Sequence, residues 1–121
     1  MSIKIGNVTQ AKAATVAYSN STAKACFTLP ANAMVIRVTV FANTAASGGT
    51  SGSLTIKSRP IDGSSAAAAF ATIADVYTSL DATLSGISYN RQSTPVYVTA
   101  VYADGTGTAT AGNWTFVVEY M

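Results

Sequence analysis

Alternation of apolar and polar side chains with a period of two is the feature that most restricts how this chain can fold. Residues 113–120 place large apolar side chains on one parity, namely Trp114, Phe116, Val118 and Tyr120. Residues 34–41 repeat the pattern with Met34, Ile36, Val38 and Val40. Successive side chains of a β-strand point to opposite faces, so each segment predicts a strand with one face in a core and the other toward solvent.

Further segments favour strands by the same criterion. Ser53–Arg59 alternates as well, and we expect this strand to end or to reach a sheet edge at Pro60, which has no N–H to donate. Pro95–Tyr102 is apolar on both parities, which is typical of a central strand covered on both faces. Ala13–Tyr18 and Lys24–Leu29 predict two shorter strands.

Turn-forming residues separate these segments. Ser19-Asn20-Ser21 predicts a turn, Asn43–Gly52 a loop rich in Gly, Ser and Thr, and Asp104–Gly107 a hairpin that links the last two strands. Several short strands with turns between them predict an all-β fold, an antiparallel β-sandwich of jelly-roll-like type. We expect residues 11–121 to form this single domain and residues 1–10 to form an extended, polar N-terminal arm.

Residues 66–84 leave two interpretations open. Phe70, Ile73, Tyr77, Leu80 and Leu84 recur at helical spacing, and the alanines at the start of the segment favour a short helix. The segment also contains the strand-forming residues Thr72, Val76, Tyr77 and Thr78. A strand followed by an irregular loop is therefore the second interpretation.

The composition indicates a surface that other subunits cover. Ala, Thr, Ser and Gly make up about half of the 121 residues, and charged residues make up 10%, against about a quarter in typical soluble domains. A surface so poor in charge is weakly solvated, so we expect neighbours to bury much of it. A compact domain with a Ser/Thr-rich surface of its own is the alternative.

Charge and hydropathy exclude several classes of partner. The net charge is +2, and the Lys and Arg residues never form a run, so we expect no nucleic-acid partner. No stretch approaches the roughly 18 apolar residues of a membrane span, so we expect no membrane partner. The first residues contain no apolar core of signal-peptide length, and we therefore expect synthesis in the cytoplasm without export.

The residues available for chemistry predict neither catalysis nor a bound metal or cofactor. The sequence has no histidine, which removes the commonest general base, and Cys26 is its one cysteine. We interpret Cys26 as a structural thiol because it lies in a predicted strand without a histidine partner. Asp62 and Asp104 precede glycines in predicted turns, and Asp75 with Asp81 lacks the spacing of a calcium loop.

The arrangement of strands along the chain carries a likeness to a known group of proteins. The likeness rests on residues 94–102, a Gly/Thr/Ala-rich hairpin and residues 111–120, with residues 15–18, 27–31 and 35–42 similar in style. In these segments the chain resembles small virion structural proteins of tailed bacteriophages, most closely the capsid decoration, or cement, proteins. The resemblance implies a β-sandwich that trimerises on the outside of an icosahedral head, with no catalytic residues.

We therefore expect a non-enzymatic cement protein on the outer capsid surface of a virion, made in the host cytoplasm, with the major capsid protein as its partner. We also expect a homo-oligomer, with a trimer favoured by the resemblance. The interface residues that we single out are Ile3, Lys4, Ile5, Tyr97 and Val101. The alternative is a receptor- or carbohydrate-binding module of a phage tail or fibre, which would contact the host through loops such as Asn43–Gly52.

Overall fold

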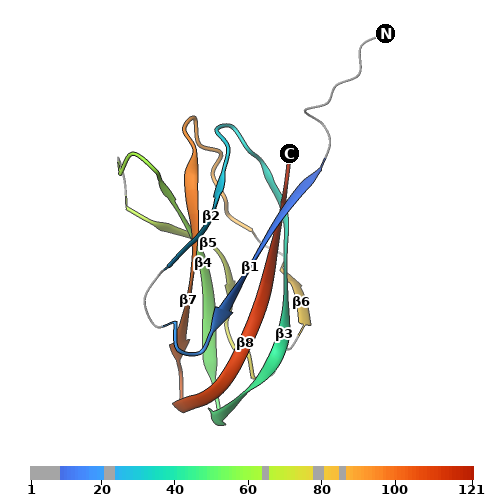
Figure 1. The fold of residues 1–121 in the computed structure, drawn as a ribbon, viewed down its shortest axis with the longest axis vertical. Helices are drawn as coiled ribbons and strands as arrows, with labels where there is room; N and C mark the ends of the chain where they lie inside the picture. The colour runs from blue at the N-terminus through green and yellow to red at the C-terminus, as the bar shows by residue number, and fades with distance from the viewer. Residues whose placement is uncertain (1–8, 21–23, 64–65, 78–80, 85–86) are drawn as a thin grey trace.

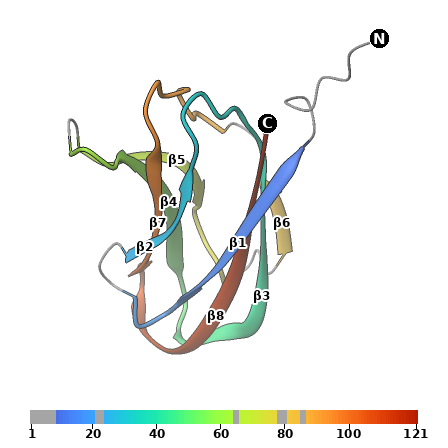
Figure 2. The same cartoon turned by 45° about the horizontal axis from the view of Figure 1, so that its top comes forward.

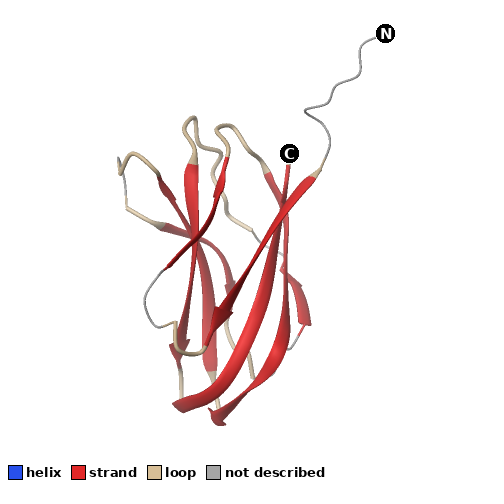
Figure 3. Cartoon of the chain, in the orientation of Figure 1, coloured by secondary structure: helices blue, strands red, loops and turns tan. Residues whose placement is uncertain are grey.

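A computed structural model describes residues 9–20, 24–63, 66–77, 81–84 and 87–121. Within these ranges the chain forms strands and loops but no helix, and hence no helix long and apolar enough to cross a membrane (Figure 3). The strands are β1 (Gln10–Ala17), β2 (Lys24–Leu29), β3 (Val35–Gly49), β4 (Gly52–Pro60), β5 (Ala68–Ile73), β6 (Asp81–Leu84), β7 (Val96–Asp104) and β8 (Gly107–Tyr120). The all-β fold class is therefore confirmed.

The described strands form two four-stranded antiparallel sheets that face each other (Figure 1). Sheet A has the strand order β1-β8-β3-β6, and sheet B has the order β2-β7-β4-β5. The pairs β1 with β8, β2 with β7, β3 with β6 and β4 with β5 are nested inside one another along the chain. This order corresponds to one long hairpin, closed between β4 and β5, that rolls up so that successive pairs alternate between the sheets. The sandwich is jelly-roll-like, as predicted.

The core lies between the sheets, and β8 supplies its largest side chains. Trp114, Phe116 and Val118 are fully buried and Tyr120 is 4% exposed, which confirms the predicted inward parity of residues 113–120. The Trp114 ring stacks on that of Tyr102 from sheet B, with centroids 5.4 Å apart. The remaining core residues include Val16, Leu29, Val38, Val40, Leu54, Ile56, Val96 and Val98.

The predicted inward parity of residues 34–41 is wrong at its start. Val38 and Val40 are buried, but Met34 is 48% exposed and Ile36 is 40% exposed. The reason is a register shift in the β3–β8 ladder between Val35 and Arg37, which adds one residue on β3. An extra residue in one strand turns the side chains that precede it to the opposite face of the sheet. Val35 therefore packs against the core, and its neighbours Met34 and Ile36 do not.

Two connections also differ from prediction. Residues 43–49, expected as part of a loop, continue β3 and pair with β8 as far as Gly49 opposite Gly107, with register shifts on the way. Asp104–Gly107 does not close a hairpin, because β7 lies in sheet B and β8 in sheet A. The segment instead carries the chain from one sheet to the other, since Gly and Asp suit either kind of turn.

The strand interpretation of residues 66–84 is right, and the helical one is wrong. Residues 68–73 form β5 at the edge of sheet B, and Asp81–Leu84 forms β6, a second strand that was not foreseen. Between them Tyr77 lies in a turn, where its N–H donates to Asp75 Oδ1 at 3.0 Å. The helical spacing arises because Phe70 and Ile73 face the core on a strand whose pairing with β4 is irregular.

The other strand predictions agree with the structure. β7 is a central strand between β2 and β4, and β4 ends at Pro60 as expected. β1 begins at Gln10, one residue before the predicted domain boundary. Residues 1–8 of the predicted arm lie outside the described residues.

Glycines allow close packing at the end of the sandwich where the chain passes from β7 to β8. A Cβ atom at Gly52 would overlap the Tyr102 hydroxyl, and one at Gly112 would lie 2.6 Å from Trp114 Cη2. Gly112 also has φ +149°, a backbone conformation that other residues rarely adopt. The side chains of Tyr102 and Trp114 therefore pack directly against the backbone of these two glycines.

We expect Gly112→Ala to lower the free energy of unfolding by about 2–5 kcal/mol, because it adds backbone strain to a clash with Trp114. Gly63→Ala is the matched control, since Gly63 has φ +72° but nothing within 4 Å of its would-be Cβ. That variant should lose only the backbone contribution of about 1–2 kcal/mol. Urea unfolding of both variants measures the difference, and equal losses would contradict the packing argument.

Candidate interaction surfaces

The described residues do not assemble an evident reactive centre. No group of three or more His, Cys, Asp or Glu side chains among them is placed to hold a metal ion. Cys26 is half-buried in β2 and packs against the core, in keeping with a structural thiol. Asp62 lies in the turn after β4, and Asp75 caps the turn at Tyr77.

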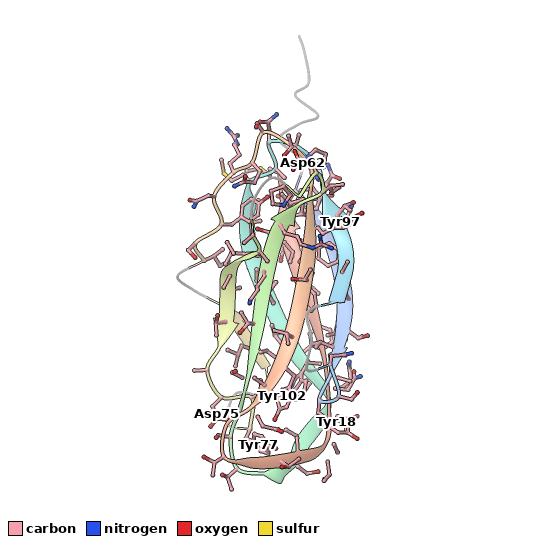
Figure 4. All side chains as sticks on the ribbon, turned by 90° about the vertical axis from the view of Figure 1, so that its left-hand side faces the viewer. Tyr18, Asp62, Asp75, Tyr77, Tyr97 and Tyr102 are labelled. Atoms are coloured by element: carbon pink, nitrogen blue, oxygen red, sulfur yellow. The ribbon has the colours of Figure 1, made fainter. Side chains whose placement is uncertain are left out.

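A polar cluster lies at the glycine-packed end, where Figure 4 shows Tyr77 and Tyr102 together. The Tyr102 hydroxyl donates to Asp104 Oδ1 at 3.0 Å, and the Ala109 N–H donates to the same oxygen at 3.0 Å. The Gly49 N–H donates to the Tyr77 hydroxyl at 3.1 Å. These bonds tie β7 to the first residues of β8 and fix the crossing between the sheets.

Burial raises the pKa of Tyr102 above its ordinary value, and its hydrogen bonds with Tyr77 and Asp104 raise the pKa further. Tyr102 is only 2% exposed and is thus a protonated, inward-facing donor at neutral pH. A nucleophile or general base would need the opposite shift. The raised pKa keeps Tyr102 protonated as a hydrogen-bond donor to Asp104.

The outer face of sheet B contains two of the predicted interface residues. Tyr97 and Val101 lie on the outward parity of β7, and both are half-buried within the single chain. The Arg59 guanidinium carbon lies 4.9 Å from the centroid of the Tyr97 ring, a cation–π arrangement that holds the ring against the sheet. Between them Thr99 is 2% exposed, and its hydroxyl has no hydrogen-bond partner among the described residues. This face therefore presents an ordered aromatic ring and an aliphatic side chain, both half-buried, on the outside of sheet B.

The outer face of sheet A is flat and nearly neutral. Ala13 of β1, Val117 of β8 and Thr39 of β3 lie side by side, and Phe41 is 39% exposed. Its charges include the ion pair of Arg37 and Glu119, with Arg37 Nε 3.2 Å from Glu119 Oε1. The pair is largely exposed, so it adds little stability, but it leaves the face with little net charge around it.

A groove of about 350 Å³ lies at the opposite end of the sandwich from the tyrosine cluster, where β1 starts and β8 ends. Figure 2 brings this end forward and shows the β2–β3 connection and the segment before β7 around it. The groove is lined by Gln10, residues 30–34, Arg91, Tyr120 and Met121. It is an open surface of mixed character, in which Ala33, Met34, Tyr120 and Met121 lie beside the polar side chains of Gln10 and Asn32 and the charged side chain of Arg91.

The structure thus places two of the five predicted interface residues, Tyr97 and Val101, on one outer face. Ile3, Lys4 and Ile5 lie outside the described residues. Sequence reasoning missed the groove because Met34 was assigned to the core and because its lining comes from separate segments. A signal was present in Pro30-Ala31-Asn32, a turn-forming run that ends two residues before Met34.

Comparison with known proteins identifies the fold. No protein-family model matches the chain, and no curated protein matches its sequence. Among solved structures, a chain in the "Acidic stable capsid structure of Helicobacter pylori bacteriophage KHP30" is similar with a TM-score of 0.68 and 13% identity, over 96% of this chain and 89% of that one. A chain in the "Cyanophage Pam1 capsid asymmetric unit" is similar with a TM-score of 0.62 and 18% identity, over 99% and 89%.

These identities are too low to transfer a function, but the coverage is nearly complete in both directions. The chain therefore has a fold that occurs in the capsids of two bacteriophages. The predicted resemblance to phage virion proteins is confirmed at the level of the fold.

We expect Tyr102→Phe to lower the free energy of unfolding by about 1–3 kcal/mol at neutral pH, because Asp104 loses a hydrogen-bond donor. The variant should also lose less stability in alkali. As the pH rises through about 10, unfolded tyrosines release their protons while Tyr102 in the folded chain retains its own, so wild-type stability falls. The free energy of unfolding should be measured between about pH 8 and pH 11 for both variants. It should fall less steeply with pH for Tyr102→Phe than for Tyr97→Phe, and equal slopes would contradict the conclusion that folded Tyr102 retains its proton.

Proposed function

We propose that this protein is a bacteriophage capsid decoration, or cement, protein that binds the outside of the head and stabilises contacts between major capsid subunits. The observation that carries the proposal is the likeness to chains in two phage capsid structures over nearly the whole of each chain. The proposed partner is the major capsid protein, the proposed location is the outer surface of the virion, and the proposed role is non-enzymatic.

The surface of the chain supports an adhesive mechanism. Charged residues make up 10% of the chain, so burying its surface desolvates few strongly hydrated groups. On the outer face of sheet B these groups include Lys57 and Arg59, which lie opposite Thr99 and Tyr97. A partner that binds only the assembled shell shifts the equilibrium toward that shell by mass action. Each bound copy would then oppose separation of the capsid subunits beneath it.

We propose that Tyr97 and Val101 contribute to the docking face. The ring of Tyr97 is already held by Arg59, so binding would order few additional side chains. Aromatic anchors on a rigid sheet are typical of residues that dominate binding energy. The arm residues Ile3, Lys4 and Ile5 are proposed as contacts to a neighbouring subunit.

A homo-oligomer completes the proposal, with three copies favoured by the resemblance to trimeric head decorations. A closed ring buries apolar surface without leaving an unpaired sticky face. The alternative of a tail or fibre module would use exposed loops such as residues 43–52 to contact the host. We favour the cement protein because the similar chains come from capsid structures, and because most of residues 43–52 are paired strand.

The purified chain should bind expanded empty heads of its own phage and should not bind isolated capsid subunits. Val101→Glu should weaken head binding about tenfold or more, because it places a charge on the docking face. Thr108→Glu adds the same charge at an exposed position of β8, and this control should bind like the wild type. Co-sedimentation with heads at increasing protein concentration measures the three affinities.

Deletion of residues 1–8 should weaken head binding more than it lowers the melting temperature, since the described core starts after these residues. Light scattering on the same samples gives the oligomeric state, for which we expect three copies. A monomer that also fails to bind empty heads would refute the cement proposal.

A further inference from the structure

The groove at the open end of the sandwich contains apolar surface that the chain itself leaves exposed. Met34 is 48% exposed and Met121 is 40% exposed, and their backbones pair through two hydrogen bonds of 2.9 Å. Ile36, displaced outward by the register shift in β3, is 40% exposed nearby along the same strand. Below them Ala33 is 3% exposed and Tyr120 is 4% exposed, and both line the groove. The apolar part of the groove, which is formed by Ala33, Met34, Tyr120 and Met121, suits an aliphatic side chain.

The residues before β1 offer an occupant of matching chemistry. Ile3 and Ile5 share one parity and Lys4 lies on the other, so an extended segment would present two aliphatic side chains on one side and a charge on the other. Ile5 lies five residues before Gln10 and Ile3 seven, so when fully extended they reach at most about 17–18 Å and about 23–25 Å from it. These spans allow contact with a second sandwich placed directly beside the first.

The start of β1 argues against occupation by the same chain. Gln10 lies on the rim of the groove, where its backbone pairs with Tyr120 and its side-chain Oε1 accepts a hydrogen bond of 3.3 Å from the Tyr120 hydroxyl. A chain fixed at the rim would have to reverse direction within the few residues after Ile5 to return Ile3 to the groove. An arm from a second copy enters without that reversal.

We propose that this groove receives Ile3 and Ile5 from the N-terminal arm of a second copy, while Lys4, on the opposite parity, points away from the groove and is left for the contact with the capsid proposed above. The inference rests on the self-association in the proposed function and names the contact that produces it. Because each copy carries one arm and one groove, head-to-tail docking fills every groove when the copies close into a ring, as in the trimer of the proposed function.

Substitutions at two adjacent arm residues, whose side chains would point to opposite sides of an extended segment, distinguish this contact from a general contribution of the arm. Ile5→Lys should weaken self-association at least tenfold, because it brings a positive charge against apolar surface in a groove that already contains the cation Arg91. Lys4→Asp, a change on the opposite parity, should leave self-association within about twofold of the wild type. Sedimentation velocity over a range of protein concentrations measures both variants, and equal effects would overturn the proposal.

Cross-linking shows which chain fills the groove. In a Cys26→Ser background, a tagged chain with Ile3→Cys is mixed with an untagged chain carrying Met34→Cys and oxidised mildly. We expect a disulfide-linked heterodimer, and at least tenfold less product when Met34→Cys is replaced by Ser19→Cys in the exposed turn after β1. A doubly substituted chain, Ile3→Cys with Met34→Cys, should form intermolecular rather than intramolecular links. Predominant intramolecular closure would overturn the proposal in favour of the chain's own arm.

The two proposals fail in different ways. If the chain forms oligomers and binds heads but gives no Ile3–Met34 cross-link above the control, this inference is wrong and the cement proposal stands. If the cross-link forms but the protein does not bind heads, the cement proposal fails and the groove assignment stands.

Discussion

The sandwich depends on the pairing of β8 with β1 on one side and β3 on the other. This double pairing runs along most of β8, from Tyr120 opposite Gln10 and Val35 to Asn113 opposite Ala17. The same strand sends its alternate side chains into the core, where Trp114 stacks on a tyrosine of sheet B. Backbone hydrogen bonds therefore hold sheet A together at the strand that also joins it to sheet B. Without β8, both its neighbours would expose an unpaired edge.

The strands that could be predicted from sequence are those in which local alternation and long-range pairing agree. Residues 113–120 and Ser53–Arg59 keep strict alternation, and each is a strand with the expected parity. The errors occur where pairing with a distant strand overrides the local pattern. Ile36 faces out because of a register shift that no single-segment pattern reveals, and residues 43–49 are strand because β8 supplies hydrogen bonds to a Gly/Ser/Thr-rich sequence that would otherwise form a loop.

The interaction surfaces were less predictable than the fold for a physical reason. Tyr97 and Val101 could be recognised because both lie on one strand whose outward parity is unusually apolar. The groove could not be recognised from the sequence, because four separate segments form its walls. These are the start of β1, the β2–β3 connection, the loop before β7 and the end of β8. No short window of sequence contains such a site. Local alternation even assigned Met34 to the core, where its hydrophobicity needed no further explanation.

The nested pairing of the strands has a consequence for how the protein folds. Since β1 pairs with β8 and β2 with β7, most contacts join residues far apart in sequence, and topologies of this kind fold in about milliseconds to seconds. During synthesis sheet B lacks its central strand β7 until residues 96–104 have left the ribosome, and sheet A cannot be completed until residues 107–120 have followed. Until then the nascent chain presents unpaired strand edges and the apolar faces of both sheets, so the last strand made is also the one that ends its exposure to aggregation.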